Sequence, residues 1–283
     1  DGTTLTVATG GESIVARFEP GVSYYAEIVS GTMAGHRVEI AESTSTDDRI
    51  AMDLDSALST LHSAPALAAG TRVIVRPHQT TEGVFGTDLL TSTDSATTAD
   101  RLLFFEEGAY RVLWLRGIGT GSAWTWETDE SATDEGAHII SPTDGLLIHV
   151  RSQALTLPVV GQVRSTAYVL PLKAGTQMIG NGYPVAQSPV DRGFTSAGFT
   201  ASGEVETADR IRLWLGDATP KTTGYESHYL QQGAAGVQWT TESTEQPESR
   251  NEAVLFQPFR ATFYKAMQDI LSHTQVPCEH FDS

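Results

Sequence analysis

Cysteine is nearly absent from this chain of 283 residues, and the single one, Cys278, lies close to the C-terminal end. One thiol excludes an internal disulfide and any metal site built from several thiolates. Two uses of Cys278 stay open at this point. It forms a bond between subunits, or it is an incidental free thiol.

Lysine is scarce as well, and basic residues are few overall. Lys plus Arg number 18 against 35 Asp plus Glu, which gives a formal net charge of −17. A field of this sign repels phosphate backbones and anionic lipid surfaces, so we expect neither nucleic acid as a partner nor membrane insertion. No apolar run is long enough to cross a bilayer. The chain begins Asp1-Gly2-Thr3 without a methionine, from which we expect a mature, exported protein whose signal has been removed, located outside the cell or on its surface.

The motifs of familiar active sites are also missing. The eight histidines are scattered without the spacing of HExxH or HxH, and no GxSxG turn occurs. The glycine-rich run 117–122 lacks the Lys-Ser/Thr ending of a phosphate-binding loop. We therefore expect no enzyme, no catalytic residues and no cofactor, and no metal ligands can be named. Calcium bound by the acidic loops at 128–130 and 134–135 is the open alternative to solvated charge.

What the chain does contain is Thr, Ser and Gly between short alternating apolar runs, which favours strands and turns. Two strands, 3–9 and 12–19, are predicted to pair through Gly10-Gly11, and a hairpin is predicted at 24–40. The spacing of Leu54, Ala57, Leu58 and Leu61 predicts a short helix at 53–61. Further predictions are listed in chain order: a strand at 72–78 that Pro77 ends or places at a sheet edge, a loop at 79–98, strands at 101–105, 109–115 and 123–127, a strand–turn–strand at 138–150, and a short helix at 264–272.

Two stretches resemble each other, 99–128 and 208–243. The matching residues, with offsets of 109 to 116 positions, are Asp100-Arg101 with Asp209-Arg210, Phe105 with Trp214, Tyr110 with Tyr225, Leu115 with Leu230, Trp124-Thr125 with Trp239-Thr240, and Pro142 with Pro258. Self-similarity of this kind indicates one fold unit used twice. We expect each Asp to bind backbone N–H groups where a strand begins, and each Arg to lie across an aromatic face.

The fold class predicted from these features is mostly β, with two related antiparallel modules, sandwich or barrel-like, and few short helices. The predicted organisation has four parts. They are 1–69 (N-terminal strands, hairpin and helix packing on the first module), 70–165 (first repeat), 166–272 (second repeat) and 273–283 (tail).

Eight stretches are distributed between residues 24 and 266: YYAEIVSGTMAGHRVEI, RVIVRPH, ADRLLFF, MIGNGYPVAQSP, ADRIRLWLGD, GYESHYL, QWTT and LFQPFRATFYKA. Together they resemble a family of uncharacterised secreted β-rich proteins common in Verrucomicrobia and related bacteria. The resemblance implies export and a duplicated β body. It carries no activity or catalytic residues.

Three functions are compatible with these observations. The first is an exported structural protein whose copies assemble into a filament, sheath or surface layer. Its contacts would come from the strand-forming N-terminus and the tail, through Thr4, Leu5, Val7, Ile14, Val15, Phe18 and Cys278. The second is a module that binds cell-surface polysaccharide through exposed indoles among Trp114, Trp124, Trp126, Trp214 and Trp239. The third is a secreted hydrolase with paired carboxylates.

Overall fold

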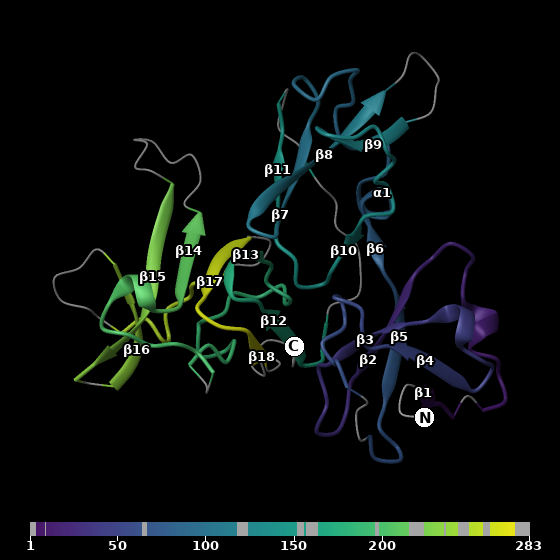
Figure 1. The fold of residues 1–283 in the computed structure, drawn as a ribbon, viewed down its shortest axis with the longest axis horizontal. Coiled ribbons are helices and arrows are strands. Elements are labelled where there is room, and N and C mark those ends of the chain that lie inside the picture. Colours follow the sequence, from purple (N-terminus) through teal and green to yellow (C-terminus); the bar gives the residue numbers. More distant parts are fainter. Residues whose placement is uncertain are drawn as a thin grey trace. The chain divides into compact units, whose positions relative to one another are not determined.

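A computed structural model describes residues 4–8, 10–63, 67–117, 124–151, 156, 164–195, 198–214, 224–234, 236–242, 249–256 and 261–274. The chain divides into two compact units. Unit 1 contains 1–78, 165–171 and 271–283, and unit 2 contains 79–164 and 172–270. The fold is mostly β, as the sequence predicted, with antiparallel sheets and few short helices (Figure 1).

Unit 1 is built on a five-stranded sheet with the order β1-β4-β3-β2-β5. Its strands are β1 (Thr4–Thr6), β2 (Tyr24–Ile28), β3 (Arg37–Ile40), β4 (Arg49–Asp53) and β5 (Val73–Pro77). The predicted hairpin at 24–40 is confirmed as β2 and β3, and β5 is an edge strand that ends at Pro77. One face of the sheet forms the apolar core, where Ala26, Ile28 and Val38 are fully buried.

The other face of this sheet is buried although it is polar. Glu27 accepts hydrogen bonds from Arg76 (3.0 Å) and from the hydroxyl of Thr166 (2.8 Å), and Glu39 lies 2.6 Å from His78. Buried carboxylates need such partners because an unpaired buried charge is strongly unfavourable. The alternation of β2 therefore reflects two buried faces of different chemistry.

Two predictions about unit 1 are wrong. Residues 12–19 contain a 3-10 helix, Val15–Arg17, in which the hydroxyl of Ser13 accepts the N–H of Ala16, so Gly10-Gly11 makes a turn without a hairpin. No helix forms at 53–61, because the Asp53 carboxylate binds the N–H groups of Asp55 and Ser56 in a tight turn. The hydroxyls of the following Ser and Thr residues then bind the backbone of β3.

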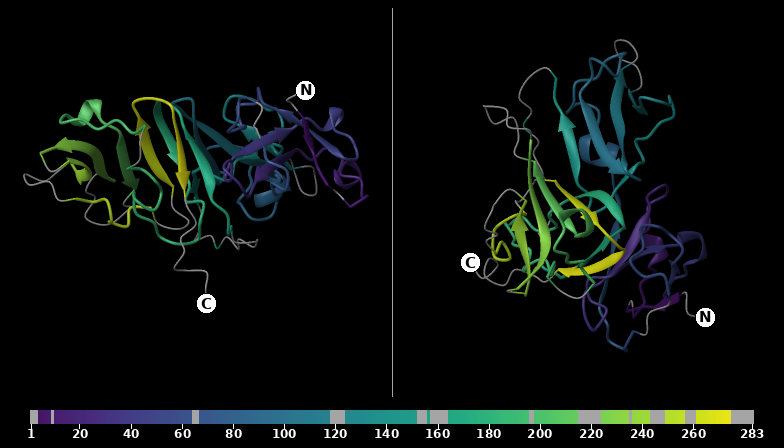
Figure 2. Two further views of the ribbon diagram at one scale, coloured as in Figure 1. Left: turned by 90° about the horizontal axis from the view of Figure 1, so that it is seen from below. Right: turned by 60° about the vertical axis from the view of Figure 1, so that its left-hand side comes forward.

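Unit 2 holds the two repeats. The first has the sheet β11-β7-β8-β9, and the second has the sheet β13-β17-β14-β15-β16 (Figure 1). The first sheet comprises β7 (Arg101–Glu106), β8 (Ala109–Gly117), β9 (Trp124–Thr128) and β11 (Leu146–His149). The second comprises β13 (Gly175–Ile179), β14 (Arg210–Trp214), β15 (Tyr225–Gly233), β16 (Gly236–Thr241) and β17 (Thr262–Ala266). The repeats share the order β11-β7-β8-β9 and β17-β14-β15-β16, and β13 lies beside β17 as an added edge strand (Figure 2).

The remaining elements are short. They are β6 (Gln79–Thr80) paired with β10 (Ile139–Ile140), α1 (Thr81–Phe85), β12 (Tyr168–Leu172) paired with β18 (Ile270–Thr274), and 3-10 helices at Glu42–Thr44 and Val205–Thr207. The predicted loop at 79–98 thus contains β6 and α1, which begins where the Thr80 hydroxyl caps Gly83 N–H. No helix in the described residues combines the length and apolar character needed to cross a membrane.

The predicted helix at 264–272 is also wrong, because this segment belongs to β17 and β18. Tyr264 is buried on one face of β17 and Phe263 on the other, an alternation that only an extended strand allows.

Unit boundaries differ from the predicted ranges: β5 pairs with β2 in unit 1, and 165–171 also belongs to unit 1. The segment 165–171 packs closely against Gly35 of unit 1, because a Cβ at Gly35 would lie 3.0 Å from the Tyr168 backbone.

Candidate functional site

The repeated aspartates anchor each module. Asp100 is buried just before β7, and its carboxylate accepts the N–H groups of Thr91 and Arg151, both at 2.8 Å. These two residues lie in the loop before the sheet and directly after β11. One side chain therefore ties together the two chain segments that flank the first sheet.

Asp209 repeats this arrangement in the second module. Its carboxylate accepts the N–H groups of Thr200 (3.0 Å) and Met267 (2.8 Å), and it also accepts the hydroxyl of Tyr264 (2.8 Å). Burial raises the pKa of Tyr264, and the nearby Asp209 charge adds to this, so the phenol stays neutral and donates. The predicted role of the Asp residues is confirmed, and it is structural.

The arginines that follow form ion pairs. Arg101 lies 3.8 Å from Asp129, and Arg210 lies 3.9 Å from Glu242 and 2.5 Å from Glu206. The cation–π contacts of the described residues involve a different arginine, the fully buried Arg192, which lies over Phe256 at 4.5 Å. The predicted stacking of Arg101 and Arg210 on aromatic faces is therefore not what these side chains do.

The register of the tryptophans corrects the sequence alignment. Leu115 pairs with Trp126 and Leu230 pairs with Trp239, so Trp126, and not Trp124, is the equivalent of Trp239. Both indoles are buried, and the backbone carbonyl of each tryptophan accepts a backbone N–H from the loop that follows. A shift of two residues keeps a side chain on the same face of a strand, so alternation could not distinguish the two registers.

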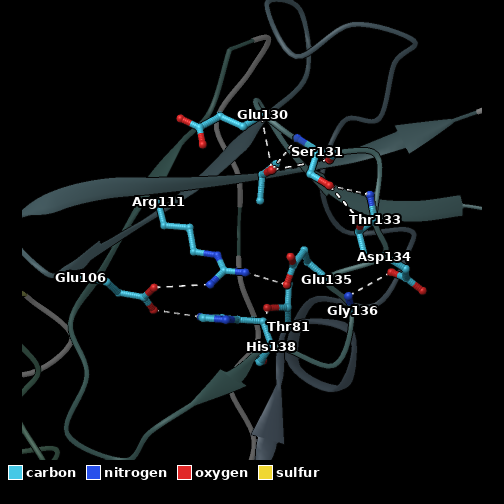
Figure 3. Close-up of polar contacts among 11 residues, drawn as sticks. Thr81, Glu106, Arg111, Glu130, Ser131, Thr133, Asp134, Glu135, Gly136 and His138 are labelled. Carbon is cyan, nitrogen blue, oxygen red and sulfur yellow. Dashed lines mark hydrogen bonds and ion pairs between the residues drawn. The ribbon is translucent and has the colours of Figure 1, made fainter.

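Four charged or titratable side chains of the first repeat form a connected network (Figure 3). Arg111 joins two carboxylates, Glu135 at 2.7 Å and Glu106 at 3.6 Å, and the ring of His138 lies 3.2 Å from Glu106. The His138 side chain holds the pKa of Glu106 below its usual range. Burial opposes this lowering, and the charge of Arg111 adds to it. Glu106 lies on β7 and Arg111 on β8, so their ion pair connects the two strands of this hairpin.

The acidic loop beside this network is organised by its own hydrogen bonds. The Thr128 hydroxyl accepts the N–H groups of Glu130 and Ser131. Asp134 accepts the N–H of Gly136 (Figure 3). Among the described residues, no three His, Cys, Asp or Glu side chains are grouped so that they could hold a metal ion. Calcium in this loop stays a prediction.

Five rings form a continuous cluster across the two repeats, which we call the aromatic strip: Phe105, Tyr110, Trp214, Tyr225 and Phe263. Each hairpin contributes one cross-strand pair, Phe105 with Tyr110 and Trp214 with Tyr225. The paired rings meet edge to face at centroid distances of 5.2 Å and 5.0 Å. The sequence matched these residues to one another, and the structure brings the two pairs together.

Phe263 joins the two pairs. Its ring lies 5.5 Å from Phe105 and 5.7 Å from Tyr225, in both cases nearly perpendicular. Phe263 itself is buried, whereas Tyr110, Trp214 and Tyr225 are 44%, 42% and 40% exposed. Burial raises the pKa of Tyr225, and the neighbouring Tyr110 adds to this effect. The strip is thus a set of rings in mutual contact, with a buried centre and an exposed rim.

Sequence reasoning missed Phe263, Arg111 and His138. A signal for Phe263 did exist, because β17 repeats β11, and Phe263 occupies the position of the apolar Leu147. The contact of the two sheets through this position could not be read from either repeat alone.

The predicted assembly residues lie within unit 1. Thr4 and Leu5 pair with β4 through Ala51 and Ile50, and the apolar residues Leu5, Val7, Ile14 and Phe18 pack against the unit 1 core. Val15 is half-buried in the 3-10 helix, and Cys278 lies outside the described residues. Of the five indoles, Trp114, Trp126 and Trp239 are buried, while Trp124 (41%) and Trp214 (42%) are exposed.

No protein-family model, curated protein or solved structure matches this chain. The resemblance to the secreted Verrucomicrobia family stays a prediction that rests on the quoted stretches alone.

Proposed function

We propose that this protein is an exported module that binds polysaccharide through the aromatic strip. The observation that supports the proposal is the exposed rim of Tyr110, Trp214 and Tyr225, held edge to face in unit 2. Exposed aromatic rings that cluster on one surface usually mark a binding site. Pyranose rings present faces of C–H groups, which stack on such rings.

Rigid rings favour binding for an entropic reason. Side chains already held in place by their neighbours lose little freedom when a ligand covers them. The two cross-strand pairs and the bridging Phe263 supply that order before any ligand arrives.

The charge of the chain favours a glycan over another copy of itself as the occupant of the strip. Two chains of formal net charge −17 repel each other over their whole surfaces. An extracellular or cell-surface location accords with such a ligand.

The test is binding of the purified chain to a glycan array and to insoluble polysaccharides. We expect the Trp214→Ala and Tyr225→Ala variants to lose most of the binding. Trp124→Ala is the matched control, because Trp124 is equally exposed but belongs to β9 and not to the strip. If no polysaccharide binds, or if the Trp214→Ala variant binds as tightly as the parent, the proposal is wrong.

A second candidate is the exported structural protein that assembles from copies of itself. The observation in its favour is that β1 is the last strand of its sheet, so its outer edge has no partner strand among the described residues. Strand donation would, however, remove Leu5 from the core of its own unit. Electron microscopy of the full chain, with a variant lacking residues 1–7 as control, tests it: filaments formed by the parent and lost in the variant support assembly.

A further inference from the structure

Two cations lie on the same sheet face as the aromatic strip in the second repeat. In an antiparallel sheet, directly opposed residues share a face, as do residues two apart along a strand. Arg212 is opposite Phe263 and two residues before Trp214. Lys265 follows Phe263 by two residues on β17. Both side chains therefore project on the face that carries the strip.

These cations differ from the other basic residues nearby. Arg210 on the same face is buried and pairs with Glu206 and Glu242. Arg212 is exposed and Lys265 half-buried, and within the described part of the chain neither forms an ion pair or a side-chain hydrogen bond. Both anions nearby form ion pairs with Arg210, and the Glu206 carboxylate also interacts electrostatically with Lys265 and Arg212.

The charges are specific to the second repeat. The equivalent positions in the first repeat are Leu103, opposite Leu147, and His149, opposite Arg101. The structural core of the repeat therefore does not require Arg212 or Lys265. In a chain of net charge −17, two cations that lie beside exposed rings and form no ion pair within the described residues are a local exception that favours an anionic ligand.

We infer that the strip binds an anionic polysaccharide, one that carries carboxylate or sulfate groups, with its sugar rings on Trp214 and Tyr225 and its anionic groups at Arg212 and Lys265. This inference rests on the proposed function and adds the chemical class of the ligand. Arg212 lies opposite Phe263 and two residues before Trp214, which places its charge beside the rings.

The experiment measures binding of the full chain to two pairs of polymers that differ only in charge. One pair is polygalacturonate and its methyl-esterified form, and the other is dextran sulfate and dextran. We expect the parent to bind one of the anionic polymers about tenfold or more tightly than its neutral counterpart, with an affinity that falls as salt is added. Comparison of the two pairs distinguishes carboxylate from sulfate.

The variants are Arg212→Gln, Lys265→Gln and their combination, with Arg49→Gln on β4 as the matched control for loss of one positive charge elsewhere. The double variant should lose about tenfold in affinity for the anionic polymer and little for the neutral one, and the control should behave as the parent.

Three results would overturn the inference. Equal binding of neutral and anionic polymers, still lost in Trp214→Ala, leaves the proposed function standing and removes the anionic ligand. Absence of binding to all four polymers, together with none on the glycan array, removes both. Self-association of the parent in sedimentation experiments, abolished by the double variant, would make a second copy of this acidic chain the occupant.

Discussion

Phe105 of the first repeat and Phe263 of the second lie edge to face, with ring centroids 5.5 Å apart and ring planes 84° apart. This contact joins the two sheets of unit 2 through rings that come from equivalent outer faces. It makes the aromatic strip one surface instead of two separate hairpin ends.

The coupling between these two rings can be measured with a double-mutant cycle. We expect Phe105→Leu and Phe263→Leu each to lower the free energy of unfolding, with a coupling energy of about 1 kcal/mol, because edge-to-face pairs contribute this much beyond area burial. Urea unfolding followed by tryptophan fluorescence provides the measurement. The pair Phe105 and Phe194, which are not in ring contact with each other, serves as a control whose effects should add. Additive effects for Phe105 and Phe263 would contradict the assigned contact.

The buried Asp209 should be among the most sensitive positions for stability. Asp209→Ala leaves the N–H groups of Thr200 and Met267 without their acceptor, and we expect a loss of about 3 kcal/mol in the free energy of unfolding. Asp94→Ala changes an exposed aspartate in the loop of the first repeat and should cost less than about 0.5 kcal/mol. Chemical denaturation of the two variants compares them, and equal losses would show that Asp209 is not an anchor.

The burial of His228 predicts how the free energy of unfolding depends on pH. This histidine is fully buried in β15, and the equivalent residue of the first repeat is Leu113. Burial lowers the pKa of His228. The Glu226 carboxylate, 3.2 Å away, opposes this effect, and the charge of Arg250 adds to it. Because the unfolded chain takes up a proton that the folded chain rejects, the free energy of unfolding falls as the pH drops below the unfolded pKa of about 6.5.

The measurement is urea unfolding between pH 7.5 and pH 5. We expect His228→Leu to flatten this dependence, since leucine removes the titrating group and already fits the equivalent position. His62→Leu, at an exposed position of unit 1, is the control and should retain the slope of the parent. Identical slopes for the parent and His228→Leu would refute the role of His228.

The network around Glu106 gives a prediction of the same sign at lower pH, because its stabilisation is also lost as the pH falls. His138 and Arg111 lower the pKa of Glu106, so its contribution to stability is present above the unfolded pKa and is lost as the pH falls through the folded value. Glu106→Gln should lower stability at neutral pH and reduce the loss between about pH 5 and pH 3. Glu107→Gln is not a suitable control, because Glu107 has a φ of 51° in the hairpin turn. Glu252→Gln on the surface of the second repeat is better. A pH profile unchanged by Glu106→Gln would show that the network is not formed.

The strands of both repeats could be predicted from the sequence because their alternation is local. A side chain's face depends only on its position within the strand, so β7, β8 and β9 and the match of Asp100 to Asp209 followed from residue order. The hairpin at 24–40 and the edge position of β5 followed in the same way, from turn glycines and Pro77.

Other features required the tertiary structure because they depend on partners distant in sequence. Residues 264–272 have helix-compatible spacing, but hydrogen bonds to β14 and β13 hold 262–266 as a strand. Trp239 matches Trp126 instead of Trp124 because of the strand register. An alternation with a period of two residues looks the same in both registers, so it could not distinguish them. Whether an indole is buried like Trp239 or exposed like Trp214 is decided by what lies opposite it, and no residue's own neighbours in sequence contain that information.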